Sequence, residues 1–197
     1  MKGGQTFARS LAFVLALTTG AWAAEDPPDF VTQAGIAGLY EVRAAEEAQR
    51  RAKTAEIRAF ADEMVNDHEK ANQELRTLAE KREWKLPAAL DAKHQGLLDR
   101  LRKLEGSKFE AEYAQQQLQA HQEAVALFKA QSEGGTDSEL KAWAGEKLQT
   151  LQVHLKHAKL LDRDPDSNVP DRSLDPSTPS ESKRPARNGA PDGATRR

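Results

Sequence analysis

Apolar residues recur with a helical period from residue 29 to residue 161, and no stretch alternates with the two-residue period of a strand. Pro87 is the only proline inside this region, and Gly134-Gly135 interrupts it once more. Proline breaks a helix because it lacks a backbone N–H and its ring clashes with the preceding turn. Its scarcity here allows long helices, so the sequence predicts an all-α fold.

The periodic region divides into four long helices and one short connecting helix, at about 29–51, 54–81, 88–106, 107–133 and 136–161. Ser107 and Thr136 each precede a glutamate by three residues, which is the capping-box pattern of a helix start. Tight turns join the first two and the last two long helices, and a long link joins these pairs. This order predicts a ferritin-like antiparallel four-helix bundle over residues 29–161, with the short helix between the second and third long helices.

The first 23 residues have the composition of a secretory signal peptide. Lys2 and Arg9 supply positive charge, Leu11–Leu17 is apolar, and Ala21-Trp22-Ala23 has small residues where a signal peptidase cleaves. The alternative, an uncleaved membrane anchor, is disfavoured because the apolar run is too short to span a bilayer. The sequence therefore predicts an exported protein of the periplasm or cell envelope with no transmembrane span in the mature chain. Residues 24–28 are a short linker.

Residues 162–197 differ from the helical region in composition. They hold six of the nine prolines and seven acidic and seven basic side chains, but no aromatic residue. Such a segment cannot bury enough apolar area to offset the entropy lost on ordering. We predict a disordered tail that is either inert or a spacer towards an envelope protein or the cell wall.

The bulk composition excludes several classes of function. Lysine and arginine number 29 against 31 aspartates and glutamates, a balance that gives no reason to expect a nucleic-acid partner. The chain has no cysteine, so it forms no disulfide, thiolate metal site or cysteine nucleophile. No glycine-rich nucleophile elbow is present either.

Four ionisable residues fall on the predicted buried stripes, one on each long helix: Glu41, His68, His121 and His154. The number of residues between each side chain and the turn that joins the two helices gives its height along the bundle. At 1.5 Å per residue, the heights of Glu41 and His68 differ by no more than roughly 5 Å. The same count separates His121 and His154 by roughly 7–8 Å.

Two interpretations of these residues remain open. One is a metal site of one glutamate and two or three histidines, which suits zinc, copper or iron. The other is a buried polar network that fixes helix packing. The absence of a Glu-x-x-His motif argues strongly against a di-iron oxidase or ferroxidase centre, because Val65 and Leu151 stand three residues before His68 and His154.

Several runs of the sequence resemble an exported bacterial family, the domain of unknown function 4142. The runs that carry the resemblance, within residues 29–161, are Gly38–Val42, Ala59–His68, His121–Phe128 and Leu148–Leu155. The resemblance implies a ferritin-like fold behind a signal peptide, in proteins often labelled outer-membrane or exported proteins, and it implies no established activity. The family positions carried over are Glu41, His68, His121 and His154.

Taken together, these observations predict an exported helical bundle that acts as a non-enzymatic binding module and holds a metal in its interior. The first alternative is a purely structural or interaction bundle whose Glu/His network only fixes packing. A metal-dependent enzyme ranks third because the di-metal motif is absent.

Overall fold

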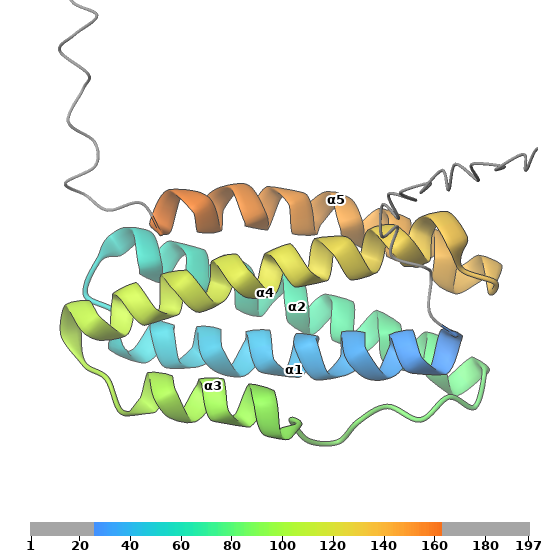
Figure 1. Cartoon of the computed structure of the whole chain (residues 1–197), viewed down its shortest axis with the longest axis horizontal. Helices are drawn as coiled ribbons and strands as arrows, with labels where there is room; N and C mark the ends of the chain where they lie inside the picture. The colour runs from blue at the N-terminus through green and yellow to red at the C-terminus, as the bar shows by residue number, and fades with distance from the viewer. Residues whose placement is uncertain (1–25, 163–197) are drawn as a thin grey trace, which may run out of the picture. The chain divides into compact units, whose positions relative to one another are not determined.

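The computed structural model describes residues 26–162, which form five helices and no strand. In chain order these are α1 (Pro27–Arg51), α2 (Ala55–Lys81), α3 (Ala92–Arg102), α4 (Gly106–Gly134) and α5 (Ser138–Leu161) (Figure 1). The all-α prediction is confirmed. The predicted signal peptide, residues 24 and 25 of the predicted linker, and residues 163–197 of the predicted tail lie outside the described residues.

The long helices pack as two hairpins. α1 packs along α2, and α4 packs along α5, while α1 also contacts α4 and α2 contacts α5 (Figure 1). The short α3 lies against α1 and α4 on the link between the hairpins. The described part of the chain is therefore a helical bundle. None of its helices combines the length and the hydropathy that crossing a membrane requires.

The helix starts differ from the predicted caps because tertiary contacts decide them. α1 begins at Pro27, two residues before the predicted start. Proline suits the first turn of a helix because the backbone N–H that it lacks would have no partner within the helix there. The capping box predicted at Ser107 is wrong. α4 already begins at Gly106, whose φ of 58° suits glycine. Glu110 instead accepts hydrogen bonds from the backbone N–H groups of Lys53 (2.6 Å) and Thr54 (2.9 Å), where α2 starts.

The capping box predicted at Thr136 is also wrong. Asp137 is the N-cap of α5, and its carboxylate accepts a hydrogen bond from the backbone N–H of Leu140 at 2.9 Å. Glu139 pairs with Lys81 (2.8 Å) and Arg82 (3.2 Å) at the end of α2 instead of closing the box. These ion pairs connect α2 of one hairpin to α5 of the other at that end of the bundle.

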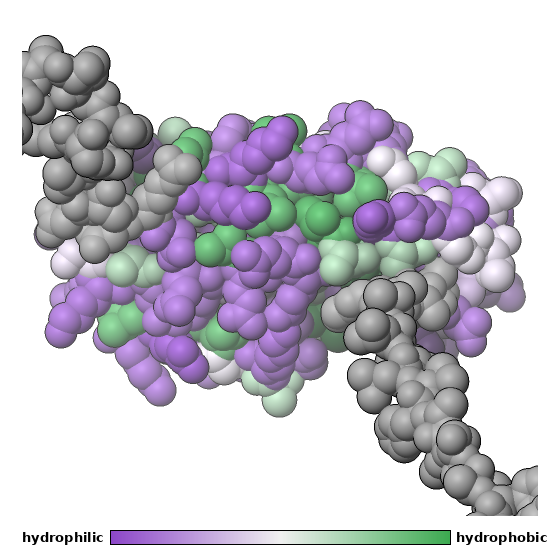
Figure 2. Space-filling model, turned by 45° about the horizontal axis from the view of Figure 1, so that its top comes forward, coloured by the Kyte–Doolittle hydropathy of each residue, from purple (hydrophilic) through white to green (hydrophobic). Residues whose placement is uncertain are grey.

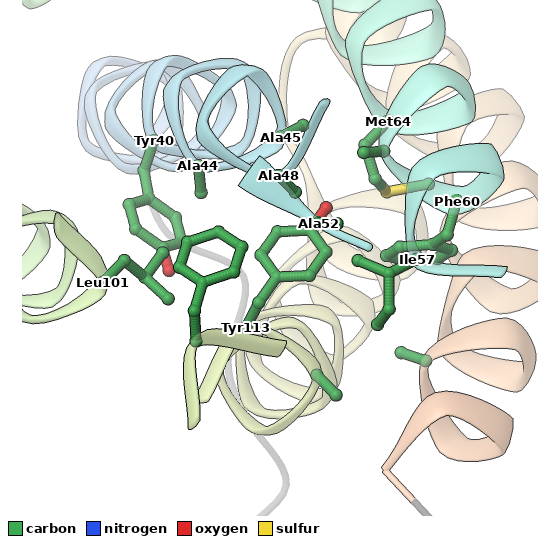
Figure 3. Packing of buried hydrophobic residues seen from close by; sticks show 14 residues of the cluster. Tyr40, Ala44, Ala45, Ala48, Ala52, Ile57, Phe60, Met64, Leu101 and Tyr113 are labelled. Carbon is green, nitrogen blue, oxygen red and sulfur yellow. The ribbon is translucent and has the colours of Figure 1, made fainter. Parts of the chain in front are cut away.

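Two apolar clusters fill the bundle, one towards each end of α1. The first contains Tyr40, Phe60, Met64 and Tyr113, and Figure 3 shows these side chains converging from α1, α2 and α4. The second contains these large residues: Phe30, Leu75, Leu78, Phe128, Leu140, Trp143 and Leu151. The face shown in Figure 2 is mostly hydrophilic, with a band of hydrophobic residues between the charged ones. Val153 and Leu160 are the only large hydrophobic residues classed as exposed among those described.

Candidate metal centre

Three histidines from three helices meet inside the bundle. They are His68 of α2, His121 of α4 and His154 of α5, hereafter the histidine cluster. One ring nitrogen of each lies within 4.8 Å of a ring nitrogen of both others. The centroids of the three rings are 5.4–5.7 Å apart.

The histidine cluster lies between the two apolar clusters. His68 follows Met64 of the first cluster by one helical turn, and the His121 ring lies 6.2 Å from that of Phe60. Leu151, one turn before His154, belongs to the second cluster. His121 and His154 are each only 1% exposed, and Nε2 of His68 is buried as well. The helical period that buries the apolar residues also buries these three polar ones.

Hydrogen bonds fix the protonation of two of the rings. Nδ1 of His121 lies 2.9 Å from the backbone oxygen of Gln117, and Nε2 of His154 lies 2.9 Å from a carboxylate oxygen of Asp67. Both partners only accept hydrogen bonds, so each of these nitrogens carries the proton and donates it. In the neutral rings, a lone pair is then left on Nε2 of His121 and on Nδ1 of His154.

Three buried nitrogens of the histidine cluster lack protein partners. Within residues 26–162, no hydrogen-bond partner reaches the buried Nε2 of His68, Nε2 of His121 or Nδ1 of His154. A buried polar atom left without a partner costs about 1–3 kcal/mol. Three such atoms that line one cavity are available to a shared partner from outside the protein, a metal ion or water.

The environment keeps the three rings neutral at pH 7. Burial lowers the pKa of His121 to about 4 and that of His68 well below its usual 6.5. Burial also lowers the pKa of His154, with His121 adding to the effect and Asp67 and Glu63 opposing it. Neutral imidazole is the form that binds metals, so the cluster is in its binding form at neutral pH.

Glu41, the predicted carboxylate of the site, lies beside the histidine cluster but bonds elsewhere. It is 4% exposed, and its Oε2 accepts a 2.7 Å hydrogen bond from Nε2 of Gln117. Burial raises the pKa of Glu41 to about 7, against the lowering effect of that bond and of His154. Because the backbone oxygen of Gln117 holds His121, Glu41 is linked to the histidine cluster through one residue.

A cavity of about 160 Å³ adjoins the histidine cluster. All three histidines and Glu41 line it, and Leu75 and Phe128 follow His68 and His121 by seven residues, about two helical turns, along α2 and α4. Large apolar residues line the rest, namely Leu75, Phe128, Trp143 and Leu151. Charged residues of α2 and α5 also border it, namely Asp67, Lys70, Glu146 and Lys147. The cluster is therefore accessible to a small molecule or ion and not sealed in the core.

Comparison with known proteins identifies the family of this chain. The domain family described as "Domain of unknown function (DUF4142)" matches residues 15–161. The chain belongs to the DUF4142 family. This confirms the resemblance found in the sequence, and no curated protein matches the chain.

Two solved structures share the fold of this DUF4142 chain. One is CopM in the Cu(II)-bound form, with a TM-score of 0.61 and 19% identity over 71% of this chain and 97% of CopM. The other is a DUF305 fragment from Deinococcus radiodurans, with a TM-score of 0.62 and 14% identity over 72% of this chain and 99% of the fragment. At such identities the likeness shows a common helical fold.

A second group of ionisable residues in this DUF4142 chain lies on the outer side of His154. This surface group consists of Glu63, Asp67 and His157. Nδ1 of His157 lies 2.9 Å from a carboxylate oxygen of Glu63, and Nε2 of His154 lies between Asp67 (2.9 Å) and Glu63 (3.8 Å). The fifth histidine, His94, pairs with Asp91 at 2.6 Å. Both histidines outside the cluster are therefore partnered by a carboxylate.

Sequence reasoning missed the two residues that orient the rings. Asp67 immediately precedes His68, so its place in the chain hides its contact with His154 on another helix. Gln117 lies four residues before His121, hence on the same face of α4, and this spacing was a usable signal. Metal-binding histidines usually donate their second N–H to a carboxylate or a backbone carbonyl, and Asp67 and Gln117 supply one of each.

Proposed function

We propose that this chain is an exported binding module that holds one transition-metal ion at His68, His121 and His154. The observation that carries the proposal is the set of three buried ring nitrogens, one from each histidine, that have no partner in the described part of the protein. Nitrogen atoms within 4.8 Å of one another need only small ring movements to reach an ion at about 2.0–2.1 Å.

The donor set indicates which ions fit. Three neutral imidazoles suit zinc, copper or iron better than the oxygen-seeking calcium and magnesium. The likeness to CopM, a structure with Cu(II) bound, supports keeping copper among the three. Three protein ligands leave a fourth position of a tetrahedral ion open. We assign the chain no reaction, in keeping with the missing di-metal motif.

Glu41 belongs to the proposed site as its carboxylate. It lines the same cavity as the histidine cluster, and its negative charge favours a cation there. Through Gln117 it also steadies the turn of α4 that holds His121.

We further propose that the bundle has ferritin-like topology and that the chain works in the periplasm or cell envelope. Four long helices, with the long link and α3 between α2 and α4, support the topology. The charged, apolar and small-residue pattern of the first 23 residues supports export.

The rival function is a structural bundle in which these residues only fix packing. The hydrogen bond that Nε2 of Gln117 donates to Glu41 favours it, because this bond joins α4 to α1 without an ion. The two functions differ in one measurable property, which is whether a first-row metal binds the native protein.

The test is metal analysis of protein purified without chelators, followed by thermal unfolding with added Zn²⁺ or Cu²⁺. We expect one ion per chain and a higher unfolding temperature, since a ligand at 100 times its Kd stabilises by about 2.7 kcal/mol. His68→Ala should abolish the gain, whereas the matched controls His94→Ala and His157→Ala should keep it. An unchanged unfolding temperature with every metal would overturn the metal function and leave the packing function.

A further inference from the structure

The cavity beside the histidine cluster is larger than a metal ion needs. Its volume is about 160 Å³, and an engineered cavity of about 150 Å³ holds a benzene molecule. An ion among the three rings would occupy only the end lined by the histidines. The rest of the space could hold a molecule with one ring or a short chain.

Small residues on three helices create this space. Ala34, Ala37 and Gly38 of α1, Ala71 of α2, and Ala120 and Ala124 of α4 all line it. A Cβ at Gly38 would lie 1.9 Å from Oδ1 of Asn72, which also lines the cavity, so a larger residue there would displace the Asn72 side chain. The unpartnered nitrogens of the histidine cluster add a polar end that lacks a ligand from the protein.

The two ends of the cavity have different chemistry. At the histidine end, three neutral imidazoles would give a divalent ion no compensating charge, and the nearest carboxylates have other partners, Glu41 on Gln117 and Asp67 on His154. This arrangement favours an anion as the next ligand. Away from the histidines, the wall includes the apolar side chains of Leu75, Phe128 and Trp143, and the charged Glu146 and Lys147 border it. The apolar part of the wall fits hydrocarbon.

We infer that the cavity binds a small organic carboxylate. Its carboxylate group would occupy the open fourth position of the bound ion, and its hydrocarbon part would lie against Leu75, Phe128 and Trp143. This inference rests on the proposed function, because the ion is what distinguishes a carboxylate from a neutral molecule of the same shape.

The test uses benzoate as the probe and isothermal titration calorimetry as the readout. Protein loaded with one equivalent of Zn²⁺ should bind benzoate, and its neutral isostere benzamide should bind at least 10-fold more weakly. The metal-free protein should also bind benzoate at least 10-fold more weakly. In the Cu²⁺-loaded protein, benzoate should shift the visible absorption band of the ion, which reports a change in its ligands.

A variant that fills the cavity gives the structural control. Ala124→Leu should weaken benzoate binding at least 10-fold and leave the zinc stoichiometry unchanged, whereas Ala111→Leu, on the exposed face of the same helix, should change neither. Ala71→Leu repeats the test from α2 if the first variant is poorly folded.

The outcomes separate the inference from the function beneath it. If zinc binds one to one but benzoate does not bind, or binds the metal-free protein equally well, the inference is wrong and the metal function stands. The inference is equally wrong if Ala124→Leu and Ala71→Leu, both folded and zinc-loaded, bind benzoate normally. If no metal binds at all, the proposed function fails and the inference fails with it.

Discussion

The histidine cluster and the surface group lie on opposite sides of one imidazole, that of His154. On the surface side, Nε2 of His154 and Nδ1 of His157 each have a carboxylate oxygen at 2.9 Å. On the inner side, Nδ1 of His154 and the Nε2 atoms of His68 and His121 have none among the described residues. The residue types are similar, but the surface group is satisfied and the histidine cluster is not.

This difference shows what separates a structural histidine from a candidate ligand. Exposed ion pairs such as Glu63–His157 contribute about 0–1 kcal/mol and need no further partner. Buried nitrogens that carry lone pairs and have no donor from the protein need a partner of another kind. Hydrogen-bond accounting therefore distinguishes the two sides of His154, whereas the mere proximity of histidines and carboxylates does not. The following predictions test the distinction, from the largest effect to the smallest.

Removing a ring from the inner side should have the largest effect. His121→Ala should lower the affinity for Zn²⁺ by more than about 100-fold, since even residues that only orient a ligand contribute about 10–100-fold. His157→Ala on the surface side should change it by less than about 3-fold. Titration against a competing chelator measures both. Equal losses from the two variants would show that the histidine cluster is not the binding site.

Neutralising Glu41 should stabilise the metal-free protein above pH 7. The folded-state pKa of Glu41 is raised to about 7 from 4.5, so its ionisation opposes folding as the pH rises through that interval. Glu41→Gln should therefore raise the free energy of unfolding by about 3 kcal/mol at pH 8 and change it little at pH 4.5.

Urea unfolding at the two pH values measures this effect, with Glu63→Gln as the surface control. A Glu41→Gln variant that is less stable than the parent at pH 8 would show that the buried carboxylate is stabilising in its charged form.

Changing Asp67, the carboxylate of the surface group that accepts a hydrogen bond from His154 of the histidine cluster, should have an intermediate effect. Asp67→Asn removes the charge that holds the proton on Nε2 of His154, so Zn²⁺ affinity should fall about 10–100-fold. Asp62→Asn, an exposed substitution on the same helix, should leave the affinity unchanged. Competition with a chelator measures the Zn²⁺ affinity of each variant. Equal affinities for Asp67→Asn and Asp62→Asn would show that Asp67 does not take part in zinc binding.

Breaking the surface pair should have the smallest effect. Glu63→Gln should lower the free energy of unfolding by no more than about 1 kcal/mol and change Zn²⁺ affinity by less than about 3-fold. Denaturant unfolding and zinc titration of the same preparation provide both values. A loss of zinc affinity comparable to that of His121→Ala would mean that the surface group takes part in binding.

One hydrophobic period predicted the four long helices and the inward position of the three histidines. The short helix, predicted at about 88–106, spans only Ala92–Arg102. Counting residues from the turn put His121 and His154 roughly 7–8 Å apart in level. Their ring centroids are nevertheless 5.4 Å apart, because side-chain length and helix offset are not part of such a count.

Contacts between distant helices could not be predicted in this way. The hydrogen bond that Gln117 donates to Glu41 depends on which side chain of α4 lies opposite Glu41 once the two helices have packed. Glu110 caps α2 although its local sequence suggests a cap on its own helix. In both cases a partner more than 50 residues away decides the outcome, and no local pattern encodes that partner.

The division of the three histidines between the hairpins has a consequence for folding. His68 belongs to the α1–α2 hairpin, whereas His121 and His154 belong to the α4–α5 hairpin, and the chain has no cysteine to join them. An ion held by all three rings would act as a reversible cross-link that closes a loop of about 50 residues. A covalent link over that length removes about 4 kcal/mol of conformational freedom from the unfolded chain. With the ion bound, the hairpins would have to separate and release it together, so the bundle would open as a single cooperative unit.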